Sequence, residues 1–228
     1  IHTSIAGDIA GALESAHKLG CNALQIFSGS PRMWPRPGSR IPAEDAERFR
    51  ARRAELGLGP VVIHANYLIN LASLDSVMRV RAIQAFHDEL IRATALGADF
   101  LVVHPGAACG ASPDDAVSAV AQALRQAARG LRLAANFADM TQRGVRILLE
   151  NTSGMGSCIG MRFAELRAIL DQAPELPLGV CLDTAHAFEA GYDLRSEEGL
   201  EQMLADLDSA VGLARVPVVH VNDSKTPL

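Results

Sequence analysis

Short apolar runs recur along the chain, and each is followed by a longer segment with helical spacing of its apolar positions. The runs show little apolar-polar alternation, which is typical of parallel strands that are buried on both faces. The alternation of strand and helix therefore predicts an α/β fold, a (β/α)₈ barrel of which about seven strands are present. We expect the strands at residues 1–6, Ala23–Phe27, Val61–Ala65, Phe100–His104, Val145–Glu150, Leu178–Asp183 and Val216–Val221.

Two of the intervening helices are marked at their ends by the sequence. Ser76–Leu96 and Pro113–Ala128 have helical spacing, and Gly97 and Gly130 follow them as C-terminal stops. Ser112 is expected to be an N-cap, because a proline and two acidic residues follow it in the first turn. The longest connection, at residues 28–41, is rich in Pro, Arg and Gly and is predicted to be a loop.

Composition narrows the class of protein. The 228 residues are 49% hydrophobic, which suits one barrel domain spanning residues 1–228, and no apolar run reaches the roughly 18 residues of a membrane span. The chain opens on Ile1 without an export signal, and its four cysteines show no CxxC spacing, so we expect a trimmed start, reduced thiols and a cytoplasmic location. A net charge of −5 argues against general nucleic-acid binding, although bound metals can still attract a phosphate.

Polar side chains close five of the expected strands, and in barrels the active site lies at these carboxyl ends. With one further histidine in an adjacent turn, the candidate ligands are His64, His104, Glu150, Asp183, His186 and His220. Histidine and carboxylate are the ligands of Zn²⁺, Mn²⁺ or Fe²⁺, and a buried carboxylate is costly without a cation. Six ligands exceed the three of one catalytic zinc, so we expect several metal ions, an arrangement suited to phosphodiester hydrolysis.

Other residues with potential chemistry have ordinary explanations. His17 and His87 lie in helical segments and are expected to be solvated or to pack, whereas His2 could belong to the surroundings of the metal site. The segment Gly154–Gly160 lacks the dinucleotide fingerprint and is predicted to be a loop beside the site. Cys181 lies inside a strand and is predicted to be a core residue.

Several motifs together resemble the endonuclease IV family. His64–Ala72, Gly179–His186 and His220–Lys225 are similar to its three signatures, the last only at its start. His104–Gly106, Leu149–Thr152 and the opening His2–Gly7 match it in the same order, so the resemblance spans the chain. Ala185 departs from the pattern, since the family usually has cysteine there, but this is not a ligand position.

The resemblance implies a xylose-isomerase-like barrel and a hydrolase that cuts DNA 5′ to abasic sites in base excision repair. It also implies trimming of blocked 3′ ends, a monomer, double-stranded abasic DNA as partner, no membrane, and three zinc ions, with Mn²⁺ or Fe²⁺ as other candidates. The implied roles place His64 and His104 on the first zinc, catalytic Glu150 between the first and second, Asp183 and His220 on the second, and His186 on the third.

The resemblance further implies that Arg32, Tyr67 and Leu68 contact DNA. Enzymes that act on a damaged nucleotide extrude it from the duplex, and apolar or aromatic wedges fill the gap that is left. Trp34, close to Arg32, could serve as a wedge or could pack within the loop, and the sequence leaves both open.

Two alternatives are weighed against the nuclease. A sugar isomerase or epimerase on a similar barrel also uses histidine and carboxylate ligands, but it needs fewer metals and lacks the Tyr67-Leu68 pair after a ligand histidine. A noncatalytic barrel that only binds DNA or a partner is less compatible with six intact ligand positions. In the family, further ligands follow the Lys225 region, so we expect a chain ending at Leu228 to bind at most two metals, to aggregate through an open sheet edge, and to be impaired in incision.

Overall fold

The computed structural model describes residues 1–135, 137–138 and 144–225. Six of the expected strands are present, and their bounds lie within two residues of the expected ones. The elements follow one another as α1 (Gly11–Lys18), β1 (Leu24–Phe27), α2 (Ala43–Glu55), β2 (Val61–His64), α3 (Ser76–Leu96), β3 (Phe100–Val103), α4 (Pro113–Ala128), β4 (Arg146–Glu150), α5 (Phe163–Gln172), β5 (Leu178–Asp183), α6 (Thr184–Glu189), α7 (Glu197–Ala210), a 3₁₀ turn (Leu213–Arg215) and β6 (Val218–His220).

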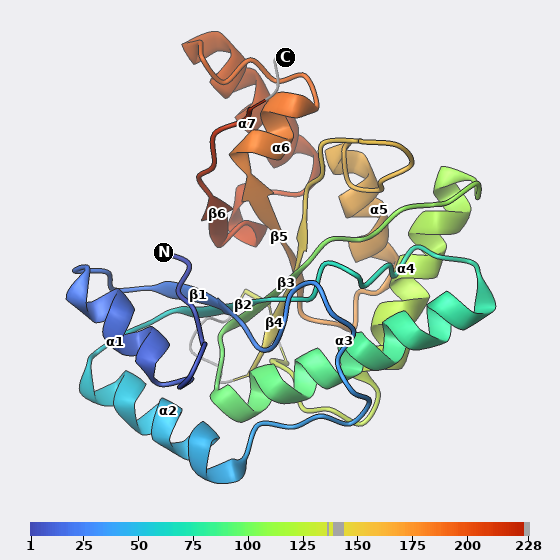
Figure 1. Cartoon of the computed structure of the whole chain (residues 1–228). Helices are drawn as coiled ribbons and strands as arrows, with labels where there is room; N and C mark the ends of the chain where they lie inside the picture. The colour runs from blue at the N-terminus through green and yellow to red at the C-terminus, as the bar shows by residue number, and fades with distance from the viewer. Residues whose placement is uncertain (136, 139–143, 226–228) are drawn as a thin grey trace.

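The strands form one parallel sheet in the order β1-β2-β3-β4-β5-β6, so each strand pairs with the next one along the chain. The sheet curls, and helices lie along its outer side, with α2 beside α3, α3 beside α4 and α4 beside α5 (Figure 1). Sequential parallel strands with a helix after each are the wall of an α/β barrel. The expected fold class is confirmed.

The segment 1–6 was expected to be a full strand, and this was wrong. It makes a single parallel bridge, between His2 and Gln25, in which Thr3 N donates to Gln25 O at 2.9 Å and Gln25 N donates to Ile1 O at 2.7 Å. The backbone then bends at Ala6 and at Gly7, whose φ is +85°. The segment therefore lies beside β1 where a first strand would lie, but it pairs with β1 only between His2 and Gln25.

The predicted helix ends are confirmed for α3 and α4. Gly97 caps α3 in the left-handed conformation, with φ +65°, and Gly130 follows α4 with φ +77°. Ser112 caps the start of α4, because its hydroxyl accepts a hydrogen bond from Asp115 N at 3.1 Å. At the start of α3, the carboxylate of Asp75 accepts from Met78 N at 2.8 Å.

The core has two layers, one on each side of the sheet. The larger layer packs the outward-facing strand residues, such as Ile63, Leu101 and Leu149, against the helices. The smaller layer fills the inside of the curl and contains Val62, Phe100, Val102, Phe137, Leu148 and Cys181, with Val218 beside it. Strands β2, β3, β4 and β5 are buried along their whole length, as their unbroken apolar sequences predicted. Within the part of the chain that the structure describes, no helix is long and apolar enough to span a bilayer.

Candidate metal centre

Strand alternation brings five candidate ligands to one mouth of the barrel. Successive side chains of a strand point to opposite faces, so residues two apart share a face. The inner layer contains one residue from each of β2 to β6, namely Val62, Val102, Leu148, Cys181 and Val218. The residues two positions further along are His64, His104, Glu150, Asp183 and His220. The inner face of each of these strands therefore changes from apolar to ligand-forming at its carboxyl end.

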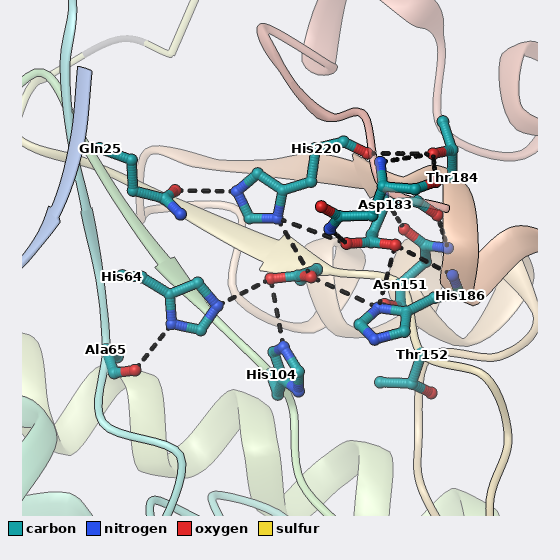
Figure 2. Close-up of polar contacts among 12 residues, drawn as sticks. Gln25, His64, Ala65, His104, Asn151, Thr152, Asp183, Thr184, His186 and His220 are labelled. Carbon is teal, nitrogen blue, oxygen red and sulfur yellow. Dashed lines mark hydrogen bonds and ion pairs between the residues drawn. The ribbon is translucent and has the colours of Figure 1, made fainter. Parts of the chain in front are cut away.

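Glu150 lies at the centre of this group and is only 2% exposed. Its Oε2 is 3.0 Å from His64 Nε2 and 3.2 Å from His104 Nε2. Its Oε1 is 3.2 Å from His220 Nδ1 and 3.4 Å from His186 Nδ1. The four imidazoles, from four different strand ends or turns, point toward a common centre (Figure 2).

The carboxyl of Glu150 is ionised in this environment. Burial alone would raise its pKa, but hydrogen bonding to His104, His186, His220 and His64 holds the pKa far below its usual range. A buried anion of this kind requires a positive charge beside it.

The hydrogen bonds behind two of the histidines decide which ring nitrogen is free to bind a cation. His64 Nδ1 lies 2.7 Å from the carbonyl of Ala65, which can only accept, so Nδ1 carries a hydrogen and Nε2 faces Glu150. His220 Nε2 lies 2.8 Å from Gln25 Oε1, so Nε2 carries a hydrogen and Nδ1 faces Glu150. The nitrogens that face Glu150 can share a proton with the carboxylate or give that proton up and bind a metal ion in its place. The donor set therefore fits a divalent metal ion.

Asp183 is the second buried carboxylate of the site. It is 2% exposed, and its oxygens lie 3.8 Å from His186 Nδ1 and 3.7 Å from His220 Nδ1. Its Oδ1 accepts from His186 N at 2.9 Å, which caps α6, and its Oδ2 accepts from Asn222 Nδ2 at 2.6 Å. Asp183 is thus held at the centre by the backbone of α6 and by the segment after β6.

Among the residues that the structure describes, three groups of side chains have ligand atoms within 4.8 Å of one another. They are His64-His104-Glu150, Glu150-Asp183-His186 and Glu150-Cys181-His220. The first is the combination expected for the first zinc, whereas the second joins Glu150 and Asp183 to His186 in place of His220, although His186 was expected on the third zinc. The third includes Cys181, which sequence reasoning placed in the core. Burial raises the pKa of the Cys181 thiol well above its usual range, which makes it a weaker candidate ligand than the neighbouring imidazoles and carboxylates. Its side chain is fully buried, as expected of a core residue.

His186 stands at the edge of the group and is shared between both carboxylates. Its Nδ1 lies 2.9 Å from the backbone oxygen of Asn151, which leaves Nε2 as the nitrogen available to a ligand. Burial alone would lower the pKa of His186, but the hydrogen bond to Glu150 and the charge of Asp183 raise it. Its assignment to a third zinc remains a prediction.

Two polar residues that support the ligands were not predicted from the sequence. Gln25, on β1, accepts the hydrogen bond from His220 across the two edges of the sheet. Asn151, 1% exposed, holds the backbone of Asp183 by two hydrogen bonds. Its side chain accepts from Asp183 N at 2.6 Å and donates to Asp183 O at 3.1 Å. A polar residue on the inner face of the apolar strand Leu24–Phe27 was the available signal for Gln25.

The predicted DNA-contacting residues lie on two loops that are joined by hydrogen bonds. Tyr67 N donates to Pro31 O at 3.0 Å, and Asn66 Nδ2 donates to the carbonyls of Ser30 and Met33, both at 2.7 Å. Arg32, on the first loop, is exposed.

Tyr67 and Leu68 lie on the second loop, directly beside the ligands. The Tyr67 ring is 51% exposed and lies 5.2 Å from the ring of His64 and 6.0 Å from that of His104, while Leu68 is half-buried. Trp34 is half-buried and packs under the guanidinium of Arg81, 4.2 Å from its ring centre, which favours loop packing over a wedge.

Of the remaining histidines, His17 and His87 lie on helices, whereas His2 lines the same cavity as Glu150. His17 is exposed on α1, and His87 Nδ1 contacts Ala127 O at 2.6 Å, which joins α3 to α4. His2 Nδ1 lies 3.3 Å from Gln25 Nε2, and burial, followed by the charges of His64 and His220, lowers its pKa. His2 therefore contacts a supporting residue of the site. The Gly154–Gly160 loop is tied to the loop after β3 by the bridge between Ala107 and Cys158.

The candidate ligands open onto a cavity of about 690 Å³. Its walls include all six of them together with Tyr67, Gln25 and Asn222. This volume lies within the range of pockets that hold small ligands or parts of larger ones.

The chain is similar to known proteins over its whole length. The family model of xylose isomerase-like TIM barrels matches residues 13–228. "Probable endonuclease 4" of Solibacter usitatus is 43% identical over 231 residues, covering 100% of this chain and 76% of that protein. "Endonuclease 4" of Thermus thermophilus is 45% identical over 225 residues, covering 98% of this chain and 75% of that protein.

The chain is also similar to solved structures. The crystal structure of endonuclease IV from a strain of Thermus thermophilus superposes with a TM-score of 0.82 at 43% identity, covering 100% of this chain and 77% of that one. A D-tagatose 3-epimerase-like protein superposes with a TM-score of 0.65 at 19% identity, covering 97% of this chain and 75% of that one, which shows the shared fold alone. The chain therefore belongs to the endonuclease IV family of the xylose isomerase-like TIM barrels.

Proposed function

We propose that this protein is a zinc-dependent endonuclease that hydrolyses the phosphodiester 5′ to abasic sites in duplex DNA and trims blocked 3′ ends. One observation carries the proposal, namely a buried, ionised Glu150 surrounded by four imidazole nitrogens at 3.0 to 3.4 Å. Membership in the endonuclease IV family supports DNA as the substrate. We also propose that the protein acts as a monomer in the cytoplasm.

The residues fit two adjacent metal positions that share Glu150. His64 and His104 face Glu150 Oε2, whereas His220, His186 and Asp183 lie on the side of Oε1. His186 is the candidate ligand for a third ion. When bound, divalent metals supply Lewis-acid activation of water and stabilise charge on the phosphate oxygens.

Other residues of the chain orient the candidate ligands and shape the cavity. Ala65 O and Gln25 orient the rings of His64 and His220, so that the ligand nitrogens are already aimed at the centre. Tyr67, which stands above His64 and His104, closes one side of the cavity and is placed to enter the gap of a missing base. The low cost of extruding a nucleotide without a paired base gives selectivity for abasic sites.

Incision of a labelled duplex with one abasic analogue tests the proposal. With zinc present, we expect a cut 5′ to the analogue and a 3′-hydroxyl that a polymerase extends. Glu150→Gln removes the central charge, so we expect loss of bound metal and at least about a hundredfold slower incision, since even outer-shell changes cost roughly 10 to 100-fold. Glu175→Gln is the control, because Glu175 is an exposed carboxylate that forms an ion pair with Arg125.

Two results would contradict the proposal. The first is a metal-loaded protein that does not cut the abasic duplex but epimerises a ketohexose, which would assign the centre to sugar chemistry. The second is Glu150→Gln protein with full metal content and full incision.

A further inference from the structure

Three charged residues of α3 are buried, although no metal ligand lies among them. Asp88, Glu89 and Arg92 are 0%, 3% and 4% exposed. Replacing buried charges with apolar residues of similar size is often neutral or stabilising, so packing α3 on the barrel does not by itself require them. Among the described residues, all hydrogen bonds and ion pairs of these three side chains go to one another, to Gln84 on α3, or to the loop 28–41.

The beginning of the loop is held by Glu89 and Arg92. Arg92 forms an ion pair with Glu89 at 3.0 Å. The hydroxyl of Ser28, the first residue after β1, lies between them. It donates to Glu89 Oε2 and accepts from Arg92 Nε at 2.7 Å.

The end of the loop is held by the same face of α3. Asp88 Oδ2 accepts from Gly38 N at 3.0 Å, and its Oδ1 accepts from Arg40 at 2.8 Å. Arg92 also donates to Ser39 Oγ at 3.2 Å and to Ser39 O at 3.3 Å. The hydrogen bonds from Gly38 and Arg40, with that from Gln84, outweigh burial and lower the pKa of Asp88, so it is ionised near neutral pH.

Between these two ends, the loop is fixed against the segment that carries Tyr67. The side chain of Asn66 bonds Ser30 O and Met33 O, and the backbone of Tyr67 bonds Pro31 O. Arg32 is held beside Tyr67 both by these hydrogen bonds in the middle of the loop and by the anchoring of the two loop ends on α3. The anchoring contacts lie outside the metal centre, so they act on the loop and not on the ligands.

We propose that Asp88, Glu89 and Arg92 are positioning residues for DNA recognition, which hold both ends of the loop 28–41 on α3 so that Arg32 stands next to Tyr67. The inference rests on the proposed function, because it is the abasic duplex that Arg32 contacts. It extends that function by separating substrate positioning, on α3, from the chemistry at Glu150.

The double variant Ser28→Ala, Asp88→Asn tests it, because it loosens both ends of the loop and leaves the Glu89-Arg92 ion pair intact. The chain has one tryptophan, Trp34, which lies in the loop and contacts Arg81 of α3, so its fluorescence reports on how the loop lies on α3. We expect acrylamide to quench Trp34 fluorescence more strongly in the variant. We also expect Kd and KM for abasic duplex to rise about tenfold, with kcat and zinc content unchanged.

Asp99→Asn is a matched control. Like Asp88, Asp99 accepts from one arginine, Arg53 at 2.7 Å, and from one backbone amide, Val61 N at 2.7 Å, but it lies before β3 at the opposite end of the barrel. It should leave quenching and KM at wild-type values. Ser28→Thr keeps the hydroxyl and should also behave as wild type. If the double variant does not fold, Ser28→Ala alone carries the test.

The outcomes separate this inference from the proposed function. Wild-type protein that neither binds nor cuts abasic duplex refutes both. Wild-type protein that cuts, with a variant whose Trp34 quenching or KM equals that of wild type, refutes the anchoring role alone. A fall in kcat and zinc content in the variant would assign these residues to the metal centre instead.

Discussion

Replacing Gln25 with leucine should weaken zinc binding although Gln25 is not itself a ligand. Gln25 Oε1 accepts from His220 Nε2 at 2.8 Å and thereby keeps the lone pair of His220 on Nδ1, which faces Glu150. Leucine has nearly the same volume but no acceptor. In Gln25→Leu the ring of His220 is free to rotate and to exchange its tautomer, so part of its population no longer presents Nδ1 to the metal.

The size of the effect follows from what is lost. Removal of an outer-shell partner typically lowers metal affinity roughly 10 to 100-fold, which corresponds to about 1.4 to 2.7 kcal/mol. The fold itself should be affected little, because Gln25 is half-buried and its side chain forms hydrogen bonds, among the described residues, with His220 and His2 alone. A net loss of about 1 kcal/mol in the free energy of unfolding of the metal-free protein is expected for one such hydrogen bond.

Zinc affinity, measured by competition with a chromophoric chelator, decides the matter. Gln25→Glu is the matched variant, because it keeps the acceptor and should bind zinc at least as tightly as wild type. The reasoning is wrong if Gln25→Leu binds zinc as tightly as wild type, or if Gln25→Glu is weakened as much as Gln25→Leu.

Two further predictions concern the surroundings of the centre. Tyr67→Ala combined with Leu68→Ala should raise the Kd for abasic duplex about tenfold or more in a binding assay, with zinc content intact, because the wedge is removed but no ligand is; loss of zinc would show a structural role instead. Asn151→Leu should lower the free energy of unfolding in urea by about 2 to 4 kcal/mol, because it leaves the buried N and O of Asp183 without their side-chain partner; a loss below about 1 kcal/mol would mean that other groups satisfy Asp183.

The sequence determined six of the strands, helices α3 and α4, and the positions of the candidate ligands. Helices α3 and α4 have the bounds that their helical spacing, their glycine stops and, for α4, the N-cap Ser112 predicted, because these signals act within a few residues of the helix end. The candidate ligands lie at the carboxyl ends of the strands, because each polar side chain directly follows an apolar run in the sequence. His64 and Glu150 end apolar strands, and two-residue alternation places them on the same face as Val62 and Leu148, while the curl of the sheet makes that face the inner one.

The tertiary structure decided what depends on residues far apart in the chain. Gln25 and His220 are separated by 195 positions and meet only because the sheet curls, so no local pattern marks their hydrogen bond. The segment 1–6 has a strand-like sequence, yet only one residue pair reaches β1 before the chain bends at Gly7. The buried charges of α3 likewise resemble an ordinary polar helix face in sequence, and they acquire a role only when the loop 28–41 folds over them, since a charge can be buried only where its partners are brought to it.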